Sequence, residues 1–130
     1  MKIVQVATGL ITIPPNGWGA VERIIWEYTT NLKLLDVDVE IKNWNDVVKE
    51  PGMLAHVHMA NTAIDMCNKD IPYIYSLHDH HAEWYGKDSG VYKNNLAAIK
   101  GSVISICHSK HIIDYFDGTD KLFYLPHGVN

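Results

Sequence analysis

The stretch that decides the fold is IVQVATGLITIPPNGWGAVERIIWEYTTNLKLL, residues 3–35. Ile3 to Ala7 is a short, nearly continuous apolar run, which is typical of a strand buried on both faces of a parallel sheet. Thr8 to Trp18 is rich in proline and glycine and is expected to be a loop. From Gly19 onward apolar residues recur at three- and four-residue spacing, which predicts an amphipathic helix.

The same alternation of strand and helix continues along the rest of the chain. The patterns predict strands at 37–41, 54–58, 72–77, 102–106 and 122–125, and helices at 62–68, 91–100 and 109–116. Strands and helices that alternate at this spacing form βαβ units, with a mostly parallel sheet and helices on both of its faces. We therefore predict one α/β domain of Rossmann-like design over residues 1–130.

Composition narrows the class of protein. Of the 130 residues, 47% are hydrophobic and 20% are charged, which is the balance of a globular domain. The net charge is −4 and the one arginine is Arg23, so the basic face of a nucleic-acid-binding protein is missing. Two isolated cysteines, Cys67 and Cys107, predict reduced, buried thiols rather than a disulfide framework.

The chain also lacks the patterns of membrane insertion and export. Its apolar runs are too short to span a bilayer, and its first residues show a strand pattern without the cleavage region of a signal peptide. We expect a cytoplasmic protein. Peripheral contact with a membrane stays open, although no polybasic cluster favours it.

Ligands of open parallel sheets bind outside the carboxyl ends of the strands. In this chain the corresponding loops follow Ala7, His58, Leu77, Ile106 and Leu125. Most glycines, histidines and polar clusters of the sequence fall in these loops. The sequence therefore predicts one functional edge of the sheet.

The first candidate site is the glycine-containing loop at residues 13–20. Small residues at a loop-to-helix junction let backbone N–H groups approach an anion, and the helix dipole favours negative charge there. The loop could cradle a diphosphate or a sugar, or it could be a turn that caps the helix, and the spacing does not separate the two. A dinucleotide fingerprint is not present, because the glycines come ten residues too late.

The second and third candidates are histidine clusters. His78 to His81 directly follow the fourth predicted strand, where a histidine can hydrogen-bond a sugar hydroxyl or carry a proton near neutral pH. The alternative is a solvated polar loop. His56 and His58 share one face of the third strand, which suggests a metal site with Asp79 as the nearest carboxylate. If buried, the same two histidines are more often packed and hydrogen-bonded.

Aromatic residues form the fourth group of candidates. Trp18, Trp84 and Tyr85 lie in loops at the functional edge, where their rings could stack on sugar faces. Trp26 and Tyr28 belong to the first helix, and packing explains them better.

One motif resembles a known family. The segment Pro14-Pro15-Asn16-Gly17-Trp18-Gly19-Ala20-Val21-Glu22-Arg23 resembles the amino-terminal domain of GT-B fold glycosyltransferases of family 4. Further matches follow in order along essentially the whole chain. They are His56 and His58, His78-Asp79, His108-Ser109 and Leu125-Pro126-His127-Gly128-Val129.

The resemblance implies a retaining transfer of a sugar from a nucleotide-sugar donor to an acceptor, with no metal or other cofactor required. It implies that Gly17, Gly19 and Ala20 approach the donor diphosphate. His78 would be the catalytic candidate, in contact with the donor sugar near the reacting carbon. The rest of the implied substrate-binding set is Trp18, His58, Asp79, His81, Ser109, His127 and Gly128.

The sequence departs from the family at several positions. Ala20 and His127 replace a usual glycine and a usual asparagine, and Leu35-Asp36 replaces a Gly-His pair. The nucleotide-binding half of the family would begin after Asn130, so we expect this chain to be inactive without a second GT-B domain or a partner chain.

We also expect an apolar patch near the carboxyl-terminal edge and a tendency to self-associate. Two alternatives to the transferase stay open at this point. One is a non-catalytic module that binds a carbohydrate acceptor, and the other, less favoured, is a metal-dependent hydrolase.

Overall fold

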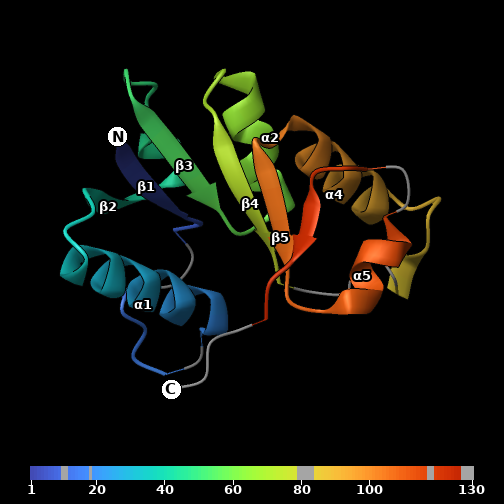
Figure 1. The fold of residues 1–130 in the computed structure, drawn as a ribbon, viewed down its shortest axis with the longest axis horizontal. Coiled ribbons are helices and arrows are strands. Elements are labelled where there is room, and N and C mark those ends of the chain that lie inside the picture. The colour runs from blue at the N-terminus through green and yellow to red at the C-terminus, as the bar shows by residue number, and fades with distance from the viewer. Residues whose placement is uncertain (10–11, 18, 79–83, 117–118, 127–130) are drawn as a thin grey trace.

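Six parallel strands form one sheet in the order β2-β1-β3-β4-β5-β6 (Figure 1). The structure is a computed structural model that describes residues 1–9, 12–17, 19–78, 84–116 and 119–126. The strands are β1 (Lys2–Ala7), β2 (Val39–Asn43), β3 (Met53–Val57), β4 (Tyr73–Leu77), β5 (Ile104–Cys107) and β6 (Leu122–Tyr124). The helices are α1 (Ala20–Leu34), α2 (Ala60–Asn68), α4 (Gly90–Gly101) and α5 (Lys110–Tyr115), with a 3-10 turn η1 (Trp44–Asp46). The predicted α/β, Rossmann-like fold is confirmed.

Three local differences separate the predicted elements from the observed ones. The fifth strand begins at Ile104 rather than Ser102, because Ser102 ends α4 by donating its amide to the Ile99 carbonyl oxygen at 3.2 Å. The stretch between β2 and β3, for which no helix or strand was predicted, contains the turn η1. Strand β2 likewise begins and ends two residues later than predicted, and every other strand and helix begins and ends within two residues of the predicted position.

The strand order places helices on both faces of the sheet. From β1 the chain crosses over α1 to β2 in one direction, whereas the crossovers from β3 to β6 all run in the other direction. Since such crossovers are right-handed, α1 covers one face and α2, α4 and α5 cover the opposite face. The contacts agree, because α1 packs on β1 and β2 while α2 packs on β3, β4 and α4 (Figure 1).

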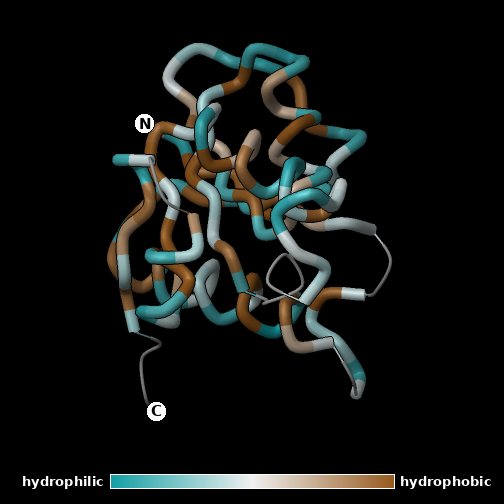
Figure 2. The backbone as a smooth tube through the Cα atoms, turned by 90° about the vertical axis from the view of Figure 1, so that its right-hand side faces the viewer, coloured by the Kyte–Doolittle hydropathy of each residue, from teal (hydrophilic) through white to brown (hydrophobic). Residues whose placement is uncertain are grey.

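The main core lies between the sheet and the face formed by α2 and α4. Tyr73 and Tyr75 of β4 point into it, and their hydroxyls donate to the Ala98 carbonyl oxygen and to Asn95 Oδ1, each at 2.6 Å. Hydrophobic and hydrophilic residues are interspersed along the chain (Figure 2), and the central strands are buried on both faces, since four consecutive residues of β1 are buried. The tyrosines therefore fix α4 against the sheet by both packing and hydrogen bonding.

One cysteine prediction is correct and the other is wrong. Cys107 at the end of β5 is a buried free thiol, and burial raises its pKa. Cys67 is exposed instead, because it lies in the last turn of α2, away from the centre of the core.

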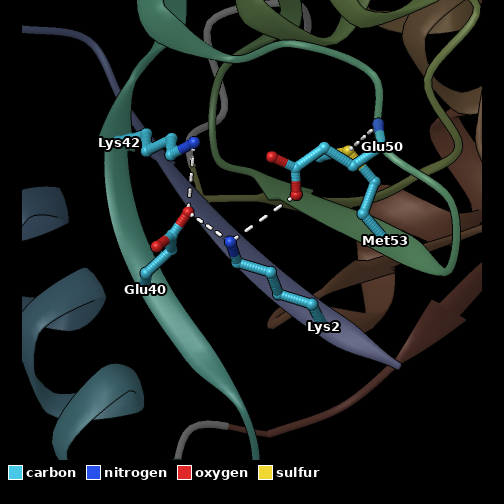
Figure 3. Close-up of polar contacts among 5 residues, drawn as sticks. All are labelled: Lys2, Glu40, Lys42, Glu50 and Met53. Atoms are coloured by element: carbon cyan, nitrogen blue, oxygen red, sulfur yellow. Dashed lines mark hydrogen bonds and ion pairs between the residues drawn. The ribbon is translucent and has the colours of Figure 1, made fainter.

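Charged residues cover the edge of the sheet at β2 (Figure 3). Lys2 Nζ lies 2.9 Å from Glu40 Oε1 and 3.6 Å from a Glu50 carboxylate oxygen, and Lys42 Nζ lies 3.2 Å from the same Glu40 atom. The hydrogen bond from Lys2 lowers the pKa of Glu40. Exposed ion pairs add little stability, but charges on an edge strand oppose pairing with a second sheet.

The opposite edge carries the expected exposed apolar residues. Ile104 and Ile106 of β5 alternate onto one face, and Phe123 of β6 is the register partner of Ile106. Phe123 is 51% exposed and Leu125, which follows β6, is 50% exposed. We call these four residues the β5–β6 strip.

Candidate functional site

A polar side chain from the middle of β1 begins the candidate site. Gln5 and His56 are register partners on the adjacent strands β1 and β3, so their side chains leave the same face of the sheet. This is the face that α1 covers. Gln5 is fully buried, and its Nε2 lies 2.8 Å from His56 Nδ1.

Gln5 joins two histidines and extends into a longer chain of contacts. Its Oε1 accepts a hydrogen bond from His58 Nε2 at 2.8 Å. His58 Nδ1 in turn lies 2.8 Å from His78 Nε2. At the other end, His56 Nε2 lies 2.7 Å from Ser76 Oγ of β4. Five side chains from three neighbouring strands and their carboxyl ends thus form one connected network, which we call the histidine network.

Aromatic rings flank the network on both sides. Tyr28 of α1 stacks on His56 with ring centroids 5.6 Å apart, and the His56 and His58 centroids are 4.2 Å apart. At the far end His108, which follows β5, stacks on His78 at 5.3 Å. His108 Nδ1 also donates to the Leu125 carbonyl oxygen at 2.7 Å, which links β5 to the segment after β6.

Burial keeps the inner histidines neutral. Desolvation lowers the pKa of His56 to about 4, with a smaller contribution from the charge of His108. The pKa of His58 lies well below 6.5, first because of burial and then because His56, His78 and His108 repel its charged form. Burial also raises the pKa of Tyr28. At neutral pH each inner imidazole therefore has one donor nitrogen and one acceptor nitrogen.

This arrangement suits His78 for interaction with a substrate. His78 is partly buried at the carboxyl end of β4, and its Nε2 contacts neutral His58. A histidine held this way can bind a hydroxyl group or carry a proton, since its contact with His58 orients the ring.

The glycine-containing loop leads into α1 at the same end of the sheet (Figure 1). Gly19 is buried at the N-cap of α1 with a φ of 148°, a left-handed conformation that favours glycine. Gly17 is exposed, and Ala20 is the exposed first residue of the helix. The N-cap glycine offers no side chain to cap the first turn of α1, where the helix dipole favours negative charge and Glu22 supplies one carboxylate.

Of the other proposed site residues, some lie outside the histidine network and some lie outside the described residues. Ser109 is partly buried at the N-cap of α5, where its Oγ lies 2.9 Å from His111 Nδ1 and takes no part in the histidine network. The exposed rings of Trp84 and Tyr85 do not belong to the network either. Five further proposed residues lie outside the described residues, namely Trp18, Asp79, His81, His127 and Gly128.

A hollow of about 410 Å³ lies at the same carboxyl-terminal edge of the sheet, but on the face that α2 covers. It is lined by Thr8 after β1, by Trp44 after β2 and by Met59 after β3, together with polar residues of α2 such as Asn61 and Asp65. The strand order reverses between β1 and β3, and this switch point is where open α/β sheets commonly bind ligands.

Sequence reasoning found part of this site and missed part of it. The expectation that His56 and His58 share a face is confirmed, and His78 lies beside them. Gln5 and Ser76 were missed, and Tyr28 was assigned to packing alone. A signal did exist, because Gln5 and Ser76 are polar residues inside runs that are otherwise apolar. Their partners lie 51 and 20 residues away, however, and no local pattern identifies them.

The geometry also bears on the metal and membrane alternatives. Within the part of the chain that the structure describes, no group of three or more histidine, cysteine, aspartate or glutamate side chains is arranged to hold a metal ion. Of the described helices, none is long and apolar enough to cross a membrane.

The sequence matches no protein-family model, and no curated protein is significantly similar to it.

Proposed function

We propose that this chain is the amino-terminal, acceptor-side half of a retaining glycosyltransferase of the GT-B type. In the reaction the anomeric carbon exchanges its bond to a phosphate oxygen of a nucleotide-sugar for a bond to an acceptor hydroxyl oxygen. The nucleoside diphosphate leaves with the bonding electron pair, and the acceptor hydroxyl loses its proton. The proposal includes a second domain or partner chain that binds the nucleotide.

The histidine network is the observation that carries the proposal. His78, the residue that would contact the donor sugar, directly follows β4, and the network orients its ring through His58. The N-terminus of α1 behind Gly19 lies at the same edge and would face the donor diphosphate. Positioning and electrostatics supply most of the catalysis in such transfers, so one half of the site should be nearly inactive alone.

The hollow at the switch point favours a second candidate function. Its volume of about 410 Å³ is in the range of small-molecule sites, and it combines the ring of Trp44 with amide and carboxylate groups of α2. Such a surface could hold a sugar ring by stacking and hydrogen bonding. The alternative function is therefore a non-catalytic module that binds a carbohydrate acceptor.

Activity of the natural gene product that contains this chain would test the proposal. The transcript is first read beyond the codon of Asn130, and the complete product is then assayed for release of nucleoside diphosphate. UDP-, GDP- and ADP-hexoses serve as donors, with mono- and disaccharides as acceptors. We expect release that depends on the acceptor and falls by about 100-fold or more in His78→Ala, since removing one hydrogen-bonding group positioned at the reacting centre costs roughly that factor.

Leu34→Ala is the control, because Leu34 is an exposed residue in the last turn of α1, outside the network, and it should leave the rate unchanged. Absence of transfer from every donor by the complete product would refute the transferase. Saturable binding of a saccharide without any transfer would instead establish the binding module.

A further inference from the structure

The amide of Gln5 has a fixed donor end and a fixed acceptor end, whereas the imidazoles of His56 and His58 can each carry their proton on either nitrogen. Its Nε2 faces His56 Nδ1 and can only donate, whereas its Oε1 faces His58 Nε2 and can only accept. Because each neutral imidazole carries one proton, the direction of the amide determines on which nitrogen that proton lies.

The orientation of the Gln5 amide determines, one ring after another, which nitrogen of each histidine in the network carries the proton. His56 accepts at Nδ1, so its proton lies on Nε2 and is donated to Ser76 Oγ. His58 donates from Nε2, so its Nδ1 is an acceptor and must receive the proton of His78 Nε2. We infer that Gln5 is a positioning residue that places the proton of neutral His78 on Nε2, through His58, and leaves Nδ1 as its basic nitrogen.

The opposite orientation of the amide gives the opposite result. If the Gln5 amide turned by 180°, Oε1 would require a proton on His56 Nδ1, and Nε2 would require a bare His58 Nε2. His58 would then carry its proton on Nδ1 and donate it to His78 Nε2. A doubly protonated His78 fits only the observed orientation, because in the reversed one an N–H group of His58 would face an N–H group of His78. Protonation of His78 and the orientation of Gln5 are therefore coupled.

Rings from other elements also face the histidine network. The groups that face it are Tyr28 from α1 and His108 from the end of β5. The charges that act on His56 and His58 come from other histidines, without a carboxylate among them. His108 has its own fixed direction, since it donates from Nδ1 to the Leu125 carbonyl oxygen. A neutral amide can therefore determine the tautomers.

The catalytic meaning of this assignment rests on the proposed function, in which His78 contacts the reacting sugar. With its Nδ1 basic, His78 would accept a hydrogen bond from a sugar hydroxyl rather than donate one. The protonation states themselves do not depend on any activity, so they can be measured on the chain without a substrate.

Nitrogen NMR of the complete chain with ¹⁵N-labelled histidine tests the inference at pH 7.5. Long-range ¹H–¹⁵N spectra distinguish a protonated ring nitrogen from a bare one. In the wild-type chain we expect His56, His58 and neutral His78 each to be protonated on Nε2.

Two variants of Gln5 separate positioning from packing. In Gln5→Glu the carboxylate accepts from both neighbours, so His56 should carry a proton on Nδ1, with or without a second one on Nε2, while His58 and His78 keep theirs on Nε2. Gln5→Met has nearly the same volume but no hydrogen bond, so both tautomers of His58 and His78 should become populated. Ser105→Ala removes a buried hydroxyl that bonds Ser102, outside the network, and should change none of these shifts.

The wild-type spectrum alone can overturn the inference, so the test does not depend on whether the variants fold. A proton on Nδ1 of His58 would overturn the assigned direction. Folded Gln5→Glu and Gln5→Met chains with unchanged histidine tautomers would overturn the coupling. Neither result bears on whether the complete product transfers sugar.

Discussion

Gln5 of β1 and His56 of β3 are neighbours in register at the centre of the sheet, and the Gln5 amide nitrogen lies 2.8 Å from His56 Nδ1. This contact places a polar group in a strand whose other central residues, Val4 and Val6, belong to the core. A buried amide is costly unless its hydrogen bonds are made, and both ends of Gln5 are bonded. The pair therefore anchors a polar network where an apolar pair would pack more simply.

Acid should destabilise the protein between about pH 6.5 and pH 4. His56 has a pKa of about 4 when folded, against 6.5 for an unperturbed histidine. The unfolded chain therefore binds more protons in this window, and the free energy of unfolding falls as the pH falls, by up to about 3 kcal/mol for this residue. His58 acts in the same direction. Urea unfolding at a series of pH values measures the slope.

The same titration contains its own control. His56→Gln should flatten the slope, because one buried titrating group is gone, while His111→Gln on the surface should preserve it. A free energy of unfolding that stays constant from pH 6.5 to pH 4 would contradict neutral burial of these histidines.

Tyr75→Phe should reduce the free energy of unfolding by about 1–2 kcal/mol. The variant keeps the buried ring but removes the donor to Asn95 Oδ1, 2.6 Å away, and leaves that acceptor without this bond in the core. Tyr85→Phe changes an exposed tyrosine and should cost less than about 0.5 kcal/mol. Chemical denaturation of both variants makes the comparison, and equal stabilities would show that the Tyr75 hydroxyl contributes nothing.

Gly101→Ala should destabilise the chain by roughly 1–3 kcal/mol through overpacking. A Cβ atom at Gly101 would lie 2.6 Å from Cys67 Sγ and 2.8 Å from the Tyr73 hydroxyl oxygen, so at least one of them must move. A Cβ atom at Gly90, the first residue of α4, would meet nothing within 4 Å among the described residues beyond its own turn of helix. Gly90→Ala should therefore be neutral or slightly stabilising. Thermal unfolding of the pair tests this, and a Gly101→Ala chain as stable as Gly90→Ala would disprove it.

The β5–β6 strip should promote self-association at high protein concentration. Phe123 lies beside Ile106, Phe123 and Leu125 are about half exposed, Ile104 is 39% exposed, and exposed apolar surface favours association. We expect Phe123→Glu to lower the average mass measured by sedimentation equilibrium. Leu34→Glu, an exposed apolar residue at the end of α1, should not change that mass. A wild-type chain that stays monomeric at millimolar concentration would rule out this role.

The sequence predicted the fold well because the signals for it are local. The apolar run that became β1, the proline and glycine residues before α1 and the spacing of apolar residues along α1 each reflect neighbours within a few positions. The shift of β5 to Ile104 shows the limit of such signals, since the hydrogen bond from Ser102 to Ile99 decides where α4 ends.

The order and type of the elements, the α/β class and the edge of the sheet that carries the candidate site were all determined by the sequence itself. Only the tertiary structure decided that Gln5, His56, His58, Ser76 and His78 form one network. Their contacts depend on which strands are neighbours and on the register between them, and these follow from hydrogen bonds and packing between distant segments. Alternation along one strand predicts that two of its side chains share a face. Which side chains of other strands they contact depends on the strand order and register of the assembled sheet.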